Sequence, residues 1–413
     1  YYLGVPLAPV LSLGILFSWF ISIVLRYVDF PSLFRLSLDS EDLGESSGWI
    51  DWRLVPLVLF SIVLVFYVYS SGVNAGNRSL GVDFGAYVTL LDDMGDSVFS
   101  AFRVMDNARP VVLILLFGFK SLFGLTSREA VKLFPMLLCP VLVLSVYYMG
   151  YQVFRSKVVA LFSAFFSLAG SLSVVGLSLY YLTNMLALSL IFLSVGFLFK
   201  ALAELELKYL AASCLVFSIV LYTHLWTFFQ YYVAFVLFGL VFLVKKADVL
   251  DEKSKRYVYY YILVSGSFFV FRLFAAGGAQ MISEIYGAGS VIQPFQYFWD
   301  NILYGFYYYS GGALSNLPFL FIVLVGLIVL NDDRWRLFTF SLLIPSSIMY
   351  LMSDGVFMSR LLYTLPLSLF AGYGLFYLLT ESRLSKQLQT GISLFIFTNC
   401  LVFLFRSLSL YVS

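Results

Sequence analysis

The chain has 413 residues, of which 61% are hydrophobic and 12% are charged. An average soluble domain is about 45–50% apolar and about 25% charged, and it must cover its surface with polar groups, so the composition excludes a soluble globular enzyme. A formal net charge of +2 also argues against a nucleic-acid partner, which needs a dense basic surface.

Long apolar runs define the predicted architecture. A helix needs about 20 apolar residues to cross the roughly 30 Å hydrocarbon layer of a bilayer, and we count about twelve such runs. We therefore predict an all-α, multi-pass membrane protein in which residues 1–413 form one transmembrane domain, without a separate soluble domain. The candidate spans are residues 3–25, 54–70, 129–149, 157–176, 179–203, 208–224, 226–244, 257–276, 316–331, 335–352, 361–380 and 391–411.

One further apolar run, residues 110–125, is assigned by charge. If it lies along the outer membrane interface without crossing, 16 of the 25 Lys and Arg residues fall in loops on one side of the membrane. Cytoplasmic loops carry such an excess. We therefore predict two long loops on the outer face: residues 71–128, which contain interfacial helices, and residues 277–315.

The three cysteines, Cys139, Cys214 and Cys400, lie inside apolar runs. This placement indicates small core residues and gives no sign of a disulfide framework or a thiolate metal site.

Two acids and an arginine in the first outer loop are candidates for chemistry. Asp83 follows the 54–70 span in the string Gly-Val-Asp-Phe-Gly. It can act as a general base, or it can simply cap the N-terminus of a helix over residues 86–91. Asp106 lies three residues before Arg109, at the start of the 110–125 run. The Arg109 guanidinium suits a phosphate, although an interface anchor that reaches lipid headgroups is the simpler alternative.

Isolated ionisable residues near the outer ends of later spans are the remaining candidates. His224 is the single histidine, so it cannot form a metal site alone, and a hydrogen-bonded structural role is the simpler interpretation. Arg272 and Arg360 each need a carboxylate or phosphate partner at that depth. Further basic residues in the first outer loop favour an anionic ligand: Arg78, Arg103, Arg109, Lys120 and Arg128.

The order of these residues resembles the polytopic glycosyltransferases of the GT-C superfamily, in particular the protein O-mannosyltransferase-like and aminoarabinose-transferase-like members. The similarity runs from Asp83 to about Ala203 and includes the pair Arg109-Pro110. It continues through Phe123-Gly124 and the string at residues 127–135. Ser359, Arg360 and Tyr363, ahead of Pro366, resemble a late helix whose arginine faces the donor phosphate. Two features depart from the pattern. Only one proline follows Arg109, and Leu182-Thr183-Asn184 stands where Arg-Pro-Asp is often seen.

This resemblance implies transfer of a monosaccharide from a polyprenyl (dolichyl or undecaprenyl) phosphate donor to a glycan, protein or lipid acceptor. We expect the reaction at the extracytoplasmic face of a prokaryotic plasma membrane. The catalytic residues would be Asp83 and Asp106, and the donor phosphate would be bound by Arg109, Arg360, Arg272 and His224. No cofactor is required, and dependence on a divalent metal stays open.

Two alternatives remain at this point. One is an oligosaccharyltransferase-like enzyme that lacks its soluble domain, because the string Met281-Ile282-Ser283-Glu284 is faintly similar to an acidic motif of oligosaccharyltransferase catalytic subunits. That similarity makes Glu284 a candidate acceptor or metal residue. The other alternative is a transporter or a non-catalytic membrane subunit. Transporters place ionisable groups near the bilayer midplane, whereas the charges here gather on one face. A tightly packed outer loop in which Asp83 caps a helix would favour the subunit.

Overall fold

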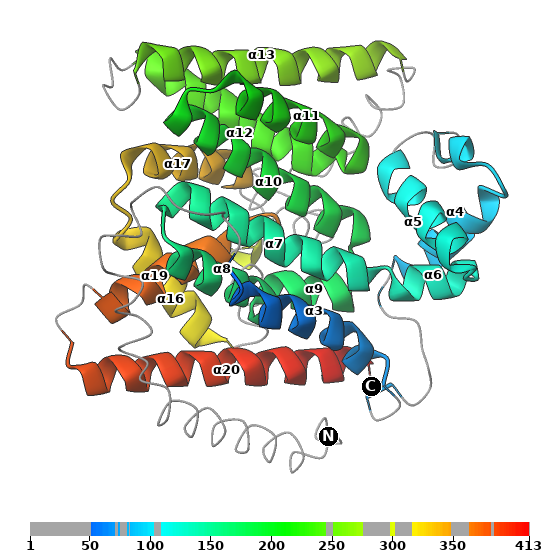
Figure 1. Cartoon of the computed structure of the whole chain (residues 1–413), viewed down its shortest axis with the longest axis horizontal. Coiled ribbons are helices and arrows are strands. Elements are labelled where there is room, and N and C mark those ends of the chain that lie inside the picture. Colours follow the sequence, from blue (N-terminus) through cyan, green and yellow to red (C-terminus); the bar gives the residue numbers. More distant parts are fainter. Residues whose placement is uncertain are drawn as a thin grey trace.

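A computed structural model describes residues 51–70, 73–74, 81, 83–102, 109–244, 251–275, 298–301, 316–347, 363–380 and 384–412. Every regular element within these ranges is a helix (Figure 1). The all-α prediction is therefore confirmed for the described residues.

Long apolar helices form the body of the molecule (Figure 1). Each predicted span after residues 3–25 coincides with one or two of them, and residues 3–25 lie outside the described ranges. The helices are α3 (Leu54–Val68), α7 (Pro135–Phe154), α8 (Lys157–Ala169), α9 (Ser171–Ser178), α10 (Leu182–Glu204), α11 (Leu207–Thr223), α12 (Leu225–Val244), α13 (Glu252–Ala275), α16 (Leu317–Ile328), α17 (Asp333–Ser347), α19 (Leu367–Thr380) and α20 (Lys386–Val412).

Four helical stretches in the described part of the chain are long and apolar enough to cross a membrane by themselves: residues 127–154, 157–178, 182–204 and 386–409. Several other apolar helices, such as α3 and α16, have 10–17 residues. A span that is this short needs flanking residues or local thinning of the bilayer. The helices indicate an integral membrane protein, and the predicted count of about twelve spans is not confirmed.

Three span boundaries differ from the predictions. The expected helix over 157–176 breaks into α8 and α9 at Gly170, whose backbone is extended. The expected start at residue 129 moves to Pro135, since residues 127–133 form a separate helix, α6. The expected start at residue 179 moves to Leu182, because Tyr180 has a left-handed backbone (φ 61°) that interrupts the helix.

Small residues let two helices of the bundle approach closely. Helix α19 packs against α8 and α16. At the α16–α19 contact, a Cβ on Gly326 would overlap the carbonyl of Phe370, and one on Gly374 would overlap the carbonyl of Ile322. Helices in a membrane gain much of their packing from such close backbone contacts.

Replacing Gly326 with Ala should therefore destabilise the protein by about 1–3 kcal/mol or more, because the added methyl group forces the α16 and α19 backbones apart. The matched control is Gly118→Ala in the exposed part of α5, where nothing lies within 4 Å of the added Cβ. That change should be neutral or stabilising by up to about 1 kcal/mol. Thermal melts of both purified variants test the difference. Equal melting temperatures would show that the two backbones have room to relax.

The first long loop forms a compact group of helices at one end of the bundle, at the right of Figure 1. We call it the α4–α6 cluster. It consists of α4 (Phe84–Asp93), the 3-10 helix η2 (Val98–Phe102), α5 (Pro110–Phe123) and α6 (Ser127–Leu133). Pro110 stands at the first turn of α5, and Gly124 ends that helix with a left-handed backbone. Thr126 and Glu129 form a capping box that starts α6. The helix expected at 110–125 is thus present, and its position along the membrane interface stays a prediction.

Candidate functional site

Asp83 immediately precedes α4, at the position of an N-cap residue. Its side chain makes no capping hydrogen bond, and its backbone (φ −87°, ψ −7°) is helical, unlike the extended backbone of a typical cap. Just before it, Gly81 has a left-handed backbone (φ +69°) and lies so close to Leu179 that a Cβ would overlap that residue's carbonyl group. The capping role that we considered for Asp83 is therefore not seen, and the chain at Gly81 lies against the α9–α10 corner.

A hydroxyl in the first turn of α10 connects α4 with the start of α5. Tyr87, one turn after Asp83, donates a hydrogen bond from its hydroxyl to Thr183 Oγ1 (3.1 Å). The Thr183 backbone N–H donates back to the Tyr87 hydroxyl (3.3 Å), and Arg109 Nη1 donates to Thr183 Oγ1 (3.4 Å). Tyr87 and Thr183 are both buried. The structure thus brings Arg109 and the first turn of α4 to one point, which we call the Thr183 junction.

The α9–α10 corner beside this junction is held by tyrosines. The Tyr180 hydroxyl donates to the Val131 carbonyl of α6 (2.5 Å) and accepts from the Tyr69 hydroxyl (3.4 Å). The Phe84 ring packs edge-on against Tyr180, with centroids 5.1 Å apart. A left-handed backbone costs a residue other than glycine about 1–2 kcal/mol. These contacts stabilise that conformation and fix the corner against α4 and α6.

Three helices begin near the Thr183 junction: α4 after Asp83, α5 after Arg109, and α10 just before Thr183. The N-terminus of a helix carries a partial positive charge and free backbone N–H groups. The Arg109 guanidinium adds a full positive charge and has donors beyond the one used on Thr183. These positive groups can bind an anion such as phosphate, and Asp83 lies one helical turn from Tyr87 of the junction. A reaction with a phosphate leaving group needs both a positive site for the phosphate and a base for the acceptor.

Two polar residues near the junction were not singled out from the sequence. Asn184, next to Thr183, is 1% exposed, and neither polar atom of its amide has a hydrogen-bond partner in the described part of the chain. Most buried side-chain amides in folded proteins have a hydrogen-bond partner, so an unsatisfied one suggests a role beyond packing. Lys132, in the last turn of α6, places its Nζ 4.6 Å from the centroid of the Tyr69 ring. In the sequence, Lys132 lies in the predicted span 129–149 and figured only in the string at residues 127–135.

His224 and Arg272 lie together at the α11–α12 corner. His224 ends α11, and its Nδ1 accepts a hydrogen bond from the Thr227 backbone N–H (3.2 Å). The Thr227 hydroxyl lies 2.8 Å from the same nitrogen. Because Nδ1 accepts from an N–H, the imidazole carries its proton on Nε2. The histidine thus starts α12 as a capping residue, which agrees with the structural role considered for it.

Arg272 is buried in the last turn of α13. It donates from Nη1 to the Leu221 carbonyl at the end of α11, and its guanidinium carbon lies 4.9 Å from the centroid of the Tyr222 ring. These two contacts are with a backbone carbonyl and an aromatic face, which the sequence did not indicate. These contacts hold the Arg272 guanidinium at the α11–α12 corner, and its role in binding a donor phosphate stays a prediction.

The remaining predicted site residues, Asp106, Arg360 and Glu284, lie outside the described residues. Tyr363, three residues after Arg360, is buried, and its ring packs edge-on against Tyr181 with centroids 6.1 Å apart. The chain that follows Arg360 thus reaches the α9–α10 corner. Within the described ranges, no three His, Cys, Asp or Glu side chains gather as a metal site would need.

The fold of this chain is similar to that of a protein with known crystal structures. No model of a protein family matches the sequence, and no curated protein matches it. A crystal structure of ArnT from Cupriavidus metallidurans bound to undecaprenyl phosphate is similar in fold. It has 13% sequence identity and a TM-score of 0.56, and the match covers 87% of this chain and 76% of that chain. The apo structure of the same protein matches with 13% identity, a TM-score of 0.54 and the same coverage.

At 13% identity this likeness establishes the fold and leaves the activity open. The resemblance expected from residues 83–203 is thus supported at the level of the fold, which is ArnT-like. The match extends over most of the chain. Together with the apolar helices, it identifies an integral, multi-pass membrane protein.

Proposed function

We propose that this chain, which shares the fold of ArnT, is a glycosyltransferase that uses a polyprenyl-phosphate-linked monosaccharide. The observation that carries the proposal is the Thr183 junction, where Arg109 and the starts of α4, α5 and α10 meet within one turn of Asp83. The structural neighbour whose crystals contain undecaprenyl phosphate supports a polyprenyl phosphate as the lipid carrier. The reaction would take place at the end of the bundle that carries the α4–α6 cluster, which we assign to the extracytoplasmic face of a plasma membrane.

In this proposal, Asp83 accepts the proton of an acceptor hydroxyl as the hydroxyl oxygen attacks the anomeric carbon. The bond between that carbon and the phosphate oxygen breaks, and polyprenyl phosphate leaves with the electron pair. Arg109 and the helix N-termini stabilise the phosphate as its negative charge grows. Such positioned charges can supply a large part of the reduction in the barrier. Asp106 and Arg360 stay candidates from the sequence, as catalytic acid and phosphate ligand. Lys132 is a further candidate, and Asn184 is a candidate for hydrogen bonding to sugar hydroxyls.

The first test of the proposal is lipid binding. The purified full chain should bind undecaprenyl phosphate in detergent, as measured by native mass spectrometry. It should bind undecaprenol, which has the same tail and no phosphate, much more weakly. A panel of undecaprenyl-phosphate-linked sugars, added with a membrane extract as the source of acceptor, should then release undecaprenyl phosphate. Equal binding of the two lipids and no release with any sugar would favour a non-catalytic membrane subunit.

A further inference from the structure

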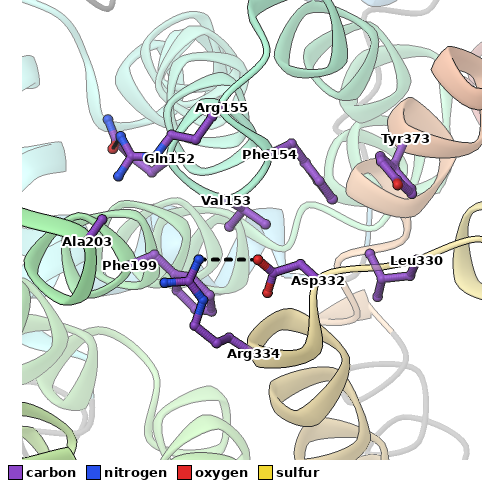
Figure 2. A pocket seen from close by; sticks show the side chains of 10 residues that line it. All are labelled: Gln152, Val153, Phe154, Arg155, Phe199, Ala203, Leu330, Asp332, Arg334 and Tyr373. Carbon is purple, nitrogen blue, oxygen red and sulfur yellow. Dashed lines mark hydrogen bonds and ion pairs between the residues drawn. The ribbon is translucent and has the colours of Figure 1, made fainter. Parts of the chain in front are cut away.

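A pocket lies at the end of the bundle opposite the α4–α6 cluster. Helix α7 begins directly after α6, has 20 residues and is thus roughly 30 Å long. The pocket surrounds its far end (Figure 2) and has a volume of about 230 Å³. Its lining also comes from the end of α10, the α16–α17 connection and Tyr373 of α19. It is therefore distinct from the Thr183 junction.

One side of this pocket is apolar and rigid. The rings of Phe154 and Tyr373 stack with centroids 4.8 Å apart and planes inclined by 10°. Val153, Phe199 and Leu330 add aliphatic and aromatic surface (Figure 2). A wall of this kind suits the glycerol and upper acyl carbons of a lipid better than it suits a fully hydrated ion.

The polar side carries two guanidinium groups and one carboxylate. Arg334 Nη2 lies 3.3 Å from Asp332 Oδ2 (Figure 2). Arg155 Nη1 donates to Gln152 Oε1 (3.1 Å), and Gln152 is 4% exposed, so its amide is built into the wall. A guanidinium has five N–H donors. The hydrogen bonds described for Arg155 and Arg334 use one donor each, which leaves several donors and a net positive charge for a ligand.

The backbone of Arg155 decides which substitution can test its side chain. It ends α7 with a left-handed conformation (φ 53°), a position that favours glycine because glycine has no Cβ. The arginine thus occupies a position where its backbone is strained. The C-termini of α7 and α10 carry partial negative charges that oppose an anion, but a partial charge at a helix end is weaker than the full charge of a guanidinium in direct contact.

We propose that this pocket binds a phosphate group, presented by the headgroup of an anionic membrane lipid, through Arg155 and Arg334. Guanidinium groups match phosphate oxygens in a forked geometry, and basic pockets between membrane helices bind anionic headgroups. The apolar wall and the position at the end of an apolar bundle favour a lipid over free phosphate. This inference does not depend on the proposed glycosyl transfer.

Thermal melts of the purified full chain test the proposal. The probes are dioctanoyl phosphatidylglycerol, dioctanoylglycerol, which lacks the phosphate, and inorganic phosphate at matched ionic strength. Phosphatidylglycerol should raise the melting temperature of the wild type, and dioctanoylglycerol should not. Arg155→Gly should fold at least as well as the wild type, since glycine suits the left-handed backbone, but it should lose the phosphatidylglycerol response. Arg334→Gln should lose the response as well.

The matched control is Arg336→Gln, since Arg336 contacts Asp333 and Asn331 and is not among the residues that line the pocket. It should keep the full response. If inorganic phosphate gives the same shift, with the same dependence on the two arginines, the pocket binds phosphate, and its ligand is free phosphate in solution and not a lipid headgroup. An undiminished response in Arg155→Gly and Arg334→Gln would overturn the proposal. So would a wild type that responds to no phosphate-containing probe.

Discussion

Asp83→Asn should lower the rate of undecaprenyl phosphate release by about 10²–10⁴-fold, the range that a general base contributes. The amide has nearly the same shape as the carboxylate but cannot accept the proton of the acceptor hydroxyl. Because Asp83 makes no capping hydrogen bond to α4, the substitution should leave that helix intact. Binding of undecaprenyl phosphate should stay unchanged, so the loss should appear in kcat.

The control for this substitution is Asp93→Asn, the same chemical change at the exposed C-terminal end of α4. It should leave both turnover and lipid binding as they are in the wild type. Normal turnover in Asp83→Asn would rule out the proposed proton transfer. A loss of lipid binding in Asp83→Asn, with unchanged binding in Asp93→Asn, would instead assign Asp83 to the architecture of the donor site.

Arg109→Gln should weaken undecaprenyl phosphate binding by about 10–100-fold, since a hydrogen bond to a charged group contributes about 1.5–3 kcal/mol. The bond to Thr183 is long, at 3.4 Å, so its loss should change the melting temperature little. Arg109→Lys keeps the charge and loses the forked geometry, and it should give an intermediate affinity. The dissociation constants can be measured by titration in detergent.

Lys120→Gln serves as the control for charge, because Lys120 lies in the last turn of the same helix α5. Its dissociation constant should match that of the wild type at moderate salt. If Lys120→Gln and Arg109→Gln weaken binding equally, the effect comes from the general positive charge of the loop. The Thr183 junction would then not be the phosphate site.

Local sequence signals predicted the helices well. Apolar runs marked each described helix of the bundle, and Pro110 and Gly124 bound α5 as proline and glycine usually do. The later start of α10 was missed because the left-handed backbone of Tyr180 has no local signature. Tertiary contacts, such as its hydrogen bond to the Val131 carbonyl, hold that conformation.

The site was predicted only in part. Asp83 and Arg109 stood out because charged residues are rare in this chain. Tyr87 and Thr183 did not, since they are 96 residues apart and their contact exists only in the folded chain. Arg272 was expected to need an anionic partner, and the structure also places a carbonyl at the end of α11 and a tyrosine ring against its guanidinium. The sequence does not predict the hydrogen bond to the backbone carbonyl, because every residue has such a carbonyl whatever its side chain.

The Thr183 hydroxyl accepts hydrogen bonds from both Tyr87 and Arg109, and this sharing has a thermodynamic consequence. An anion that draws the Arg109 guanidinium away from Thr183 changes the environment of the Tyr87 hydroxyl, one turn from Asp83. Free-energy coupling between two binding events is reciprocal. A donor lipid that strengthens acceptor binding through this link must therefore itself be held more tightly when the acceptor is present.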